Sequence, residues 1–197
     1  MTAVGTGHGP IGGLVLAAGA AERFGGRKQL AELDGRPLLE HVLAAMAGAP
    51  LDRVVVVLGA QAEEVGAGVD LHGAQAVVCA DWREGQAASL RAGIEALAGA
   101  GAVVVALGDQ PRISARAVER VLAARAPGAL AVRATYDGAP GHPVVLESDL
   151  FGAIARLGGD EGARSLLEGV AVRDVACDGL GRPDDVDTPE QLEVLRA

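Results

Sequence analysis

Aromatic side chains are scarce in this chain: Trp, Tyr and Phe together make up 2% of the 197 residues. Proteins that bind single-stranded nucleic acid stack bases on aromatic rings along a basic groove, whereas the formal net charge here is −9. The same negative charge opposes binding to duplex nucleic acid or to an anionic membrane surface. These absences argue against nucleic acid and membranes as partners and favour a small-molecule site.

Cysteine is also rare. Cys79 and Cys177 lie far apart in strand-like runs and form no CxxC pair, so we expect two reduced, buried thiols, as is usual in the cytoplasm. No apolar run reaches the roughly 18 residues of a membrane span, and the N-terminus lacks the basic start and apolar core of a signal peptide. We therefore expect a cytoplasmic protein with a flexible lead-in, residues 1–10, and one domain, residues 11–197.

Short apolar runs alternate with helical patterns along the chain. The run 54–58 contains only Val and Leu, which is typical of a strand covered on both faces of a parallel sheet. Such alternation indicates a parallel α/β sheet with right-handed crossovers. The predicted strands are 11–17, 53–58, 75–79, 102–107, 129–135, 144–147 and 171–177, and the predicted helices are 37–47, 62–65, 86–97, 115–126, 150–157, 161–167 and 189–195.

The rhythm changes over residues 136–143, where Gly138, Pro140, Gly141 and Pro143 form a predicted turn between two strands. This turn favours a late antiparallel strand. The fold prediction is therefore a single three-layer, Rossmann-like α/β domain whose sheet is mostly parallel, with one late antiparallel strand.

Two predicted strands end in residues suited to phosphates. In open α/β sheets, ligands bind beyond the carboxyl ends of the strands. The small residues 17–20 after the first strand let the backbone approach a ligand, and Arg23 and Lys28 can neutralise a polyphosphate. Asp109 follows the strand 102–107, and a lone carboxylate there suits a hydrated Mg²⁺ that takes its other ligands from phosphate.

The glycine spacing matches neither GxxxxGK[ST] nor GxGxxG. Each candidate residue also has a plainer interpretation. The cations can belong to a solvated loop, Asp109 can cap the following helix, and His142 can be a turn residue. The remaining candidates with a structural alternative are Trp82 as a core residue, Asp160 and Glu161 as acids at a helix start, and Asp187 as a solvated neighbour of Thr188.

Residues 16–30 read LAAGAAERFGGRKQL and resemble the nucleotidyltransferase signature LAAGxSxRxGxxKxL, with Ala21 in place of its serine. The resemblance continues along the chain in the order found in molybdenum cofactor cytidylyltransferases and other MobA-like NTP transferases. The further matching blocks are GRPLLEHVL (35–43), VVVVLG (54–59), DWREGQAASLRAG (81–93), LGDQP (107–111), GHPVVL (141–146), LGGDEGARSLL (157–167) and DVDTPEQLEVL (185–195).

The resemblance implies an Mg²⁺-dependent transfer of CMP, or another NMP, from an NTP to the phosphate of a molybdopterin-type cofactor, with release of pyrophosphate. CTP is favoured because the loop reads LAAG rather than LAGG. A molybdoenzyme or its chaperone is a further implied partner. By the same resemblance, the catalytic residues are Arg23, Lys28 and Asp109; the nucleotide is bound by Leu16, Ala17, Ala18, Gly19, Arg23, Lys28, Gly85, Gln86 and Ser89; the acceptor is bound by His142, Asp160 and Arg164; and the metal is held by Asp109 and Asp187, with Asp185 as the alternative to Asp187.

Three alternatives stay open at the level of sequence. The same fold can use GTP or another phosphorylated acceptor. An NAD(P)H-dependent oxidoreductase can place its phosphates in the same loop without a metal, and a noncatalytic nucleotide sensor or cofactor-insertion chaperone can bind without turnover. The transferase prediction requires Lys28 and Asp109 to face a common cleft.

Overall fold

The computed structural model describes residues 9–159 and 161–196, so residues 1–8 of the predicted lead-in lie outside the described residues. A seven-stranded sheet forms the centre, in the order β5-β4-β1-β6-β8-β7-β9. Its strands are β1 (Ile11–Ala17), β4 (Arg53–Leu58), β5 (Gln75–Val78), β6 (Ala102–Leu107), β7 (Ala131–Tyr136), β8 (Ala139–Glu147) and β9 (Val172–Ala176). The helices are α1 (Leu38–Ala47), α2 (Ala62–Gly68), α3 (Gln86–Ala96), α4 (Ala115–Ala123), α5 (Phe151–Ile154), α6 (Ala163–Leu167) and α7 (Pro189–Arg196).

The strand directions confirm the predicted fold. β1 pairs in parallel with β4 and β6, β4 with β5, and β7 with β9. β8 alone among these strands runs antiparallel, to both β6 and β7. The result is a mostly parallel sheet with one late antiparallel strand, as predicted.

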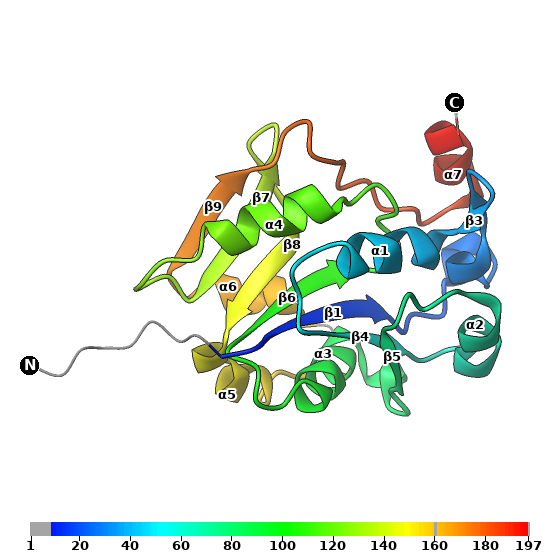
Figure 1. Cartoon of the computed structure of the whole chain (residues 1–197). Coiled ribbons are helices and arrows are strands. Elements are labelled where there is room, and N and C mark those ends of the chain that lie inside the picture. Colours follow the sequence, from blue (N-terminus) through cyan, green and yellow to red (C-terminus); the bar gives the residue numbers. More distant parts are fainter. Residues whose placement is uncertain (1–8, 160, 197) are drawn as a thin grey trace, which may run out of the picture.

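Helices cover both faces of this sheet (Figure 1). On one face, Val15 and Val56 pack in a cluster with residues of α1, α2 and α4. On the other face, Leu14, Val55 and Val57 pack with residues of α3, α5 and α6. Neighbouring residues of one strand therefore enter different cores, which explains why the run 54–58 is apolar throughout.

Both cysteines are buried and unpaired, and within the described residues no helix has both the length and the apolar character needed to cross a membrane.

Two tight turns produced the main differences from the predicted elements. β8 begins at Ala139 rather than at 144, because Asp137 and Gly138 form a two-residue hairpin turn with φ of 50° and 78°. A second Asp-Gly turn, Asp34–Gly35 with φ of 53° and 77°, joins the unpredicted short strands β2 (Glu32–Leu33) and β3 (Arg36–Pro37). The prolines of β8 are tolerated because its pairing with β6 covers only 144–147.

The other boundaries moved less. β1, β4 and β6 have the predicted bounds, α7 is one residue longer than predicted, and α5 and α6 are shorter than predicted. The helix predicted at 150–157 is replaced by a 3-10 turn, Ser148–Leu150, followed by the four-residue α5. α6 covers only five residues of the helix predicted at 161–167. Residues with low helix propensity follow both short helices: Gly158 and Gly159 come after α5, and Gly169 comes after α6.

Gly93 sets how closely α3 approaches β1. A Cβ at this position would stand 2.3 Å from Cδ1 of Leu14, so we expect Gly93→Ala to lower the free energy of unfolding by about 1–3 kcal/mol through overpacking. This loss should exceed the roughly 1 kcal/mol that alanine gains over glycine in a helix. Urea unfolding measures the difference. The matched control is Gly152→Ala in α5, where a Cβ meets open space; equal stability of Gly93→Ala and the wild type would contradict this packing.

Candidate functional site

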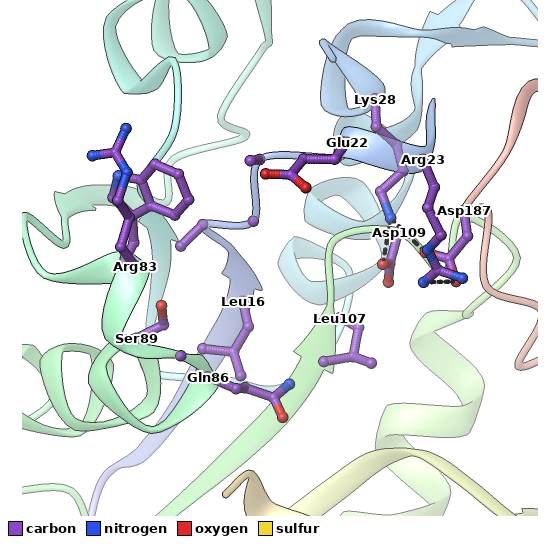
Figure 2. A pocket seen from close by; sticks show the side chains of 16 residues that line it. Leu16, Glu22, Arg23, Lys28, Arg83, Gln86, Ser89, Leu107, Asp109 and Asp187 are labelled. Atoms are coloured by element: carbon purple, nitrogen blue, oxygen red, sulfur yellow. Dashed lines mark hydrogen bonds and ion pairs between the residues drawn. The ribbon is translucent and has the colours of Figure 1, made fainter. Parts of the chain in front are cut away.

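A cleft of about 830 Å³ lies at the carboxyl ends of β1 and β6. The order of the strands reverses at β1, because the chain continues to β4 and β5 on one side and then returns to β6 on the other. Open α/β sheets place their ligand sites at this kind of switch point. Leu16 of β1 and Leu107 of β6 line the cleft (Figure 2), so the sheet itself supplies its apolar surface.

One wall of the cleft comes from the segment after β1. Its lining residues are Ala18, Gly19, Ala20, Ala21, Glu22, Arg23 and Lys28. The chain reverses within this segment because Ala21 and Arg27 adopt left-handed φ values, each 54°. Ala17, predicted to bind nucleotide, is buried beneath this wall and is not among the residues lining the cleft.

Four charged side chains converge on this side (Figure 2). Lys28 Nζ donates to Asp109 Oδ2 at 2.8 Å and to Asp187 Oδ1 at 3.0 Å. Arg23 Nη2 donates to Asp187 Oδ2 at 2.9 Å. The Lys28 side chain is only 12% exposed, against 75% for Arg23, so the ammonium is the inner cation between the two carboxylates. Lys28 and Asp109 thus lie in one cleft, as the transferase prediction requires.

The plainer interpretations of these residues do not fit. Asp109 is not the cap of α4, because that helix begins at Ala115 and Ser114 Oγ accepts the hydrogen bond from the N–H of Ala117. Asp187 is not merely solvated, since both of its oxygens accept from cations. Its neighbour Asp185 instead accepts from Gln110 Nε2 at 2.8 Å and is not among the residues that line the cleft.

The charges of the cluster support one another. Burial acts to lower the pKa of Lys28, but the charge of Asp109 and the hydrogen bonds to both carboxylates outweigh it and raise that pKa. Burial acts to raise the pKa of Asp187, and here the Lys28 and Arg23 cations prevail and lower it. Burial raises the pKa of Asp185, and the hydrogen bond from Gln110 and the charge of Lys28 only partly oppose it. Lys28 and Asp187 are therefore held as ions.

The residues present fit a hydrated divalent cation. Among the described residues, Asp109 Oδ1 is buried without a hydrogen-bond partner, and the Asp187 carboxylate faces the same ammonium as Asp109. Within residues 9–159 and 161–196, no group of three or more His, Cys, Asp or Glu side chains is placed to hold a metal. Two carboxylates suit Mg²⁺ or Mn²⁺ when water and phosphate oxygens supply the other ligands.

The opposite wall comes from the segment that leads into α3. It contributes Trp82, Arg83, Gly85, Gln86 and Ser89, so the three predicted nucleotide residues of this segment line the cleft. The sequence did not single out Arg83 or Glu22. The Arg83 guanidinium lies over the Trp82 ring, 4.4 Å from its centroid. The run DWREG, just before the predicted nucleotide residues, was the sequence signal that could have identified Arg83.

The predicted acceptor residues are less closely associated with the cleft. His142 lies on β8, is partly buried, and is not among the cleft-lining residues. Burial lowers the pKa of His142 to about 4, while the negative charge of Asp109 acts to raise it. Asp160 lies outside the described residues, and Arg164 can be placed only by its main chain, in α6.

Comparisons with known proteins agree with this geometry. Residues 13–175 match the sequence profile described as the MobA-like NTP transferase domain. Nicotine blue oxidoreductase of Paenarthrobacter nicotinovorans is 36% identical over 193 residues, which cover 92% of this chain and 94% of that protein. Purine catabolism protein PucB of Bacillus subtilis (strain 168) is 34% identical, covering 93% of this chain and 95% of that protein.

Solved structures also resemble this chain over nearly its whole length. Rv0371c of Mycobacterium tuberculosis H37Rv superposes with a TM-score of 0.86 at 34% identity, covering 94% of this chain and 96% of that chain. A structure of Rv0371C from the same organism in complex with manganese superposes with a TM-score of 0.81 at 32% identity, covering 94% and 97% of the two chains.

His142 should make stability depend on pH. Its pKa is about 4 in the folded protein and about 6.5 in an unfolded chain, so between these values the unfolded chain binds the additional proton. The free energy of unfolding should fall by up to about 1 kcal/mol for each pH unit from 6.5 down to 5. Urea unfolding at several pH values tests this, and His142→Gln should flatten the slope. Equal slopes for both proteins would contradict the assignment.

Lys28→Met should expose the two carboxylates to a divalent cation. Without the shared ammonium, Asp109 and Asp187 repel each other, so Mn²⁺ alone should bind roughly tenfold more tightly than to the wild type. Electron paramagnetic resonance of free Mn²⁺ measures this without nucleotide. Arg27→Met is the matched control, because it removes a neighbouring cation that pairs with Glu64 instead. The idea is wrong if Lys28→Met and Arg27→Met bind Mn²⁺ equally.

Proposed function

The chain belongs to the family of MobA-like NTP transferase domains, and from this premise we propose that it transfers CMP from CTP to the phosphate of a molybdopterin-type cofactor. Pyrophosphate is the second product, and Mg²⁺ is the metal. The observation that supports this proposal best is the convergence of Arg23 and Lys28 with Asp109 and Asp187 at the switch point of the sheet.

The reaction joins two anions, so positive charge has to neutralise both of them and hold them in line. An oxygen of the acceptor phosphate attacks the α-phosphorus of the nucleotide, a phosphoanhydride bond forms, and the bond to the β-phosphate oxygen breaks as pyrophosphate leaves. A protein base is not needed, because a phosphate monoester is already ionised near pH 7. In this proposal, Arg23 and Lys28 neutralise the triphosphate.

Asp109 and Asp187 would hold the divalent ion, which supplies further positive charge to the phosphates. The Oδ1 of Asp109, buried and without a partner in the part of the chain that the structure describes, supports this role, as does the manganese complex of a 32% identical relative. The wall formed by Gly85, Gln86 and Ser89 would take the base and ribose, and the cleft volume of about 830 Å³ is in the range of nucleotide-sized sites.

The proposed acceptor and the proposed base of the nucleotide both rest on the sequence resemblance. LAAG at 16–19 favours CTP, and the order of the matching blocks favours a pterin acceptor. His142, Asp160 and Arg164 are the proposed acceptor residues. His142 lies on β8, beside the strand that leads to Asp109, which would place the acceptor on the β8 side of the triphosphate. A molybdoenzyme or its chaperone would receive the product in the cytoplasm.

A second candidate function is an NAD(P)H-dependent oxidoreduction in the same cleft. The specific observation in its favour is the 36% identity over nearly the whole chain to a protein named nicotine blue oxidoreductase. A dinucleotide could place its pyrophosphate against Arg23 and Lys28. No divalent ion is needed for hydride transfer, so Asp109 would then be dispensable.

A pyrophosphate-release assay distinguishes the two functions. The purified protein is offered each of the four NTPs with molybdenum cofactor, with and without Mg²⁺; we expect the fastest release with CTP, only with Mg²⁺. Lys28→Ala should lower turnover by about 10²–10³-fold, by analogy with lost transition-state donors, and Asp109→Asn should abolish the Mg²⁺-dependent rate.

Asp149→Asn is the matched control, because this exposed carboxylate follows the end of β8, which pairs with the start of β6 and so lies at the opposite end of the strands from the cleft. Its rate should equal that of the wild type. Substrate-dependent NADPH oxidation that survives Asp109→Asn would support the oxidoreductase instead. Tight nucleotide binding with neither activity would refute both functions.

A further inference from the structure

Buried polar side chains are rare in this protein and gather at the cleft. A buried polar group lowers stability unless its hydrogen bonds are satisfied. In the part of the chain that the structure describes, the buried polar side chains are Gln29, Ser89 and Gln110, each at most 5% exposed. Ser89 lines the cleft. The two glutamines directly follow Lys28 and Asp109 in sequence, the two residues that meet at its centre.

Gln29 binds the loop that follows β1. Its Nε2 donates to the carbonyl oxygens of Ala17 and Gly19, each at 3.1 Å. The carbonyl between them, that of Ala18, accepts from the N–H of Ala60 at 3.1 Å. Three successive carbonyls at the start of the loop are therefore engaged within the protein. A carbonyl oxygen that pointed into the cleft would repel a phosphate, whereas backbone N–H groups attract one.

Gln110 binds the segment that leads to Asp187. Its Nε2 donates to Asp185 Oδ1 at 2.8 Å and to the carbonyl oxygen of Pro183 at 3.2 Å. A main-chain hydrogen bond joins the same two segments, since the N–H of Val186 donates to the carbonyl of Asp109 at 2.9 Å. Segment 183–187 is thereby held against the end of β6, which brings Asp187 within reach of the Lys28 ammonium.

The Gln110 amide is only half satisfied. Its Oε1 is buried without a hydrogen-bond partner among the described residues, and an unsatisfied buried acceptor is destabilising. An apolar side chain of similar shape would avoid that loss, but it would leave Asp185 Oδ1 and the Pro183 carbonyl without this donor. The amide therefore acts on Asp187 through the segment that carries it.

We propose that Gln29 and Gln110 are positioning residues with separate tasks. Gln29 keeps the loop carbonyls turned away from the bound phosphates, and Gln110 keeps Asp187 opposite Asp109 for the divalent cation. The assignment of phosphates and cation rests on the proposed function. Each glutamine should therefore control the binding of a different ligand.

Two isosteric replacements test this separation with ligands that need neither the base nor the acceptor. Inorganic tripolyphosphate probes the loop without metal, by calorimetry, and Mn²⁺ probes the carboxylates without phosphate, by electron paramagnetic resonance. Gln29→Glu should weaken tripolyphosphate binding at least tenfold and leave Mn²⁺ binding within about twofold. Gln110→Met should weaken Mn²⁺ binding at least fivefold and leave tripolyphosphate binding within about twofold.

Gln29→Met tests the same contacts without a new charge and serves if Gln29→Glu does not fold. Gln75→Met, at an exposed position on β5, is the matched control and should change neither affinity. Loss of both affinities together in either variant, or of neither, would overturn the proposal. If the wild type releases no pyrophosphate from any NTP but the two affinities separate as expected, the proposed reaction is wrong and the positioning roles stand.

Discussion

The ammonium of Lys28 is the contact on which the whole cleft depends. It joins the loop after β1 to Asp109 at the end of β6 and to Asp187 just before α7. Without a cation between them, the two carboxylates would repel each other at close range in a partly buried place. Lysine is found nowhere else in the sequence; every other long cationic side chain is arginine. A compact point charge with three rotatable donors suits a position that serves two carboxylates and, in the proposed reaction, phosphates.

Much of the fold could be predicted from sequence because it rests on local patterns. The apolar runs that became β1, β4 and β6 are covered on both faces, so composition alone marks them. The start of β8 was missed because prolines and glycines usually mark turns. In β8 the prolines precede the part of the strand that pairs with β6, so they remove no hydrogen bond from that pairing. An Asp-Gly pair forms the turn of this hairpin, and a second Asp-Gly pair forms the turn between β2 and β3. Each pair was a sequence signal for a two-residue turn.

The candidate site was predictable where charge and strand ends coincide, as at Lys28 and Asp109, and through the resemblance, as at Asp187. The buried glutamines were not predictable, because their role depends on which backbone atoms fold beside them. Gln110 reaches acceptors 73 and 75 residues later in the chain, and no local pattern encodes that pairing. His142 is a different case: its motif suggests contact with the acceptor, the structure places it on β8 outside the cleft lining, and its role stays a prediction.

The ion pair between Arg23 and Asp187 spans 164 positions of sequence. A nascent chain emerging from the ribosome can complete β1, its loop and most of the sheet before residue 187 has been synthesised. Until that last segment docks, Lys28 and Asp109 lack their third partner and the cleft remains open along one side. The charged cluster of the cleft therefore cannot form during most of translation, and a chain that ends before Asp187 would contain all seven strands of the sheet but an incomplete cluster.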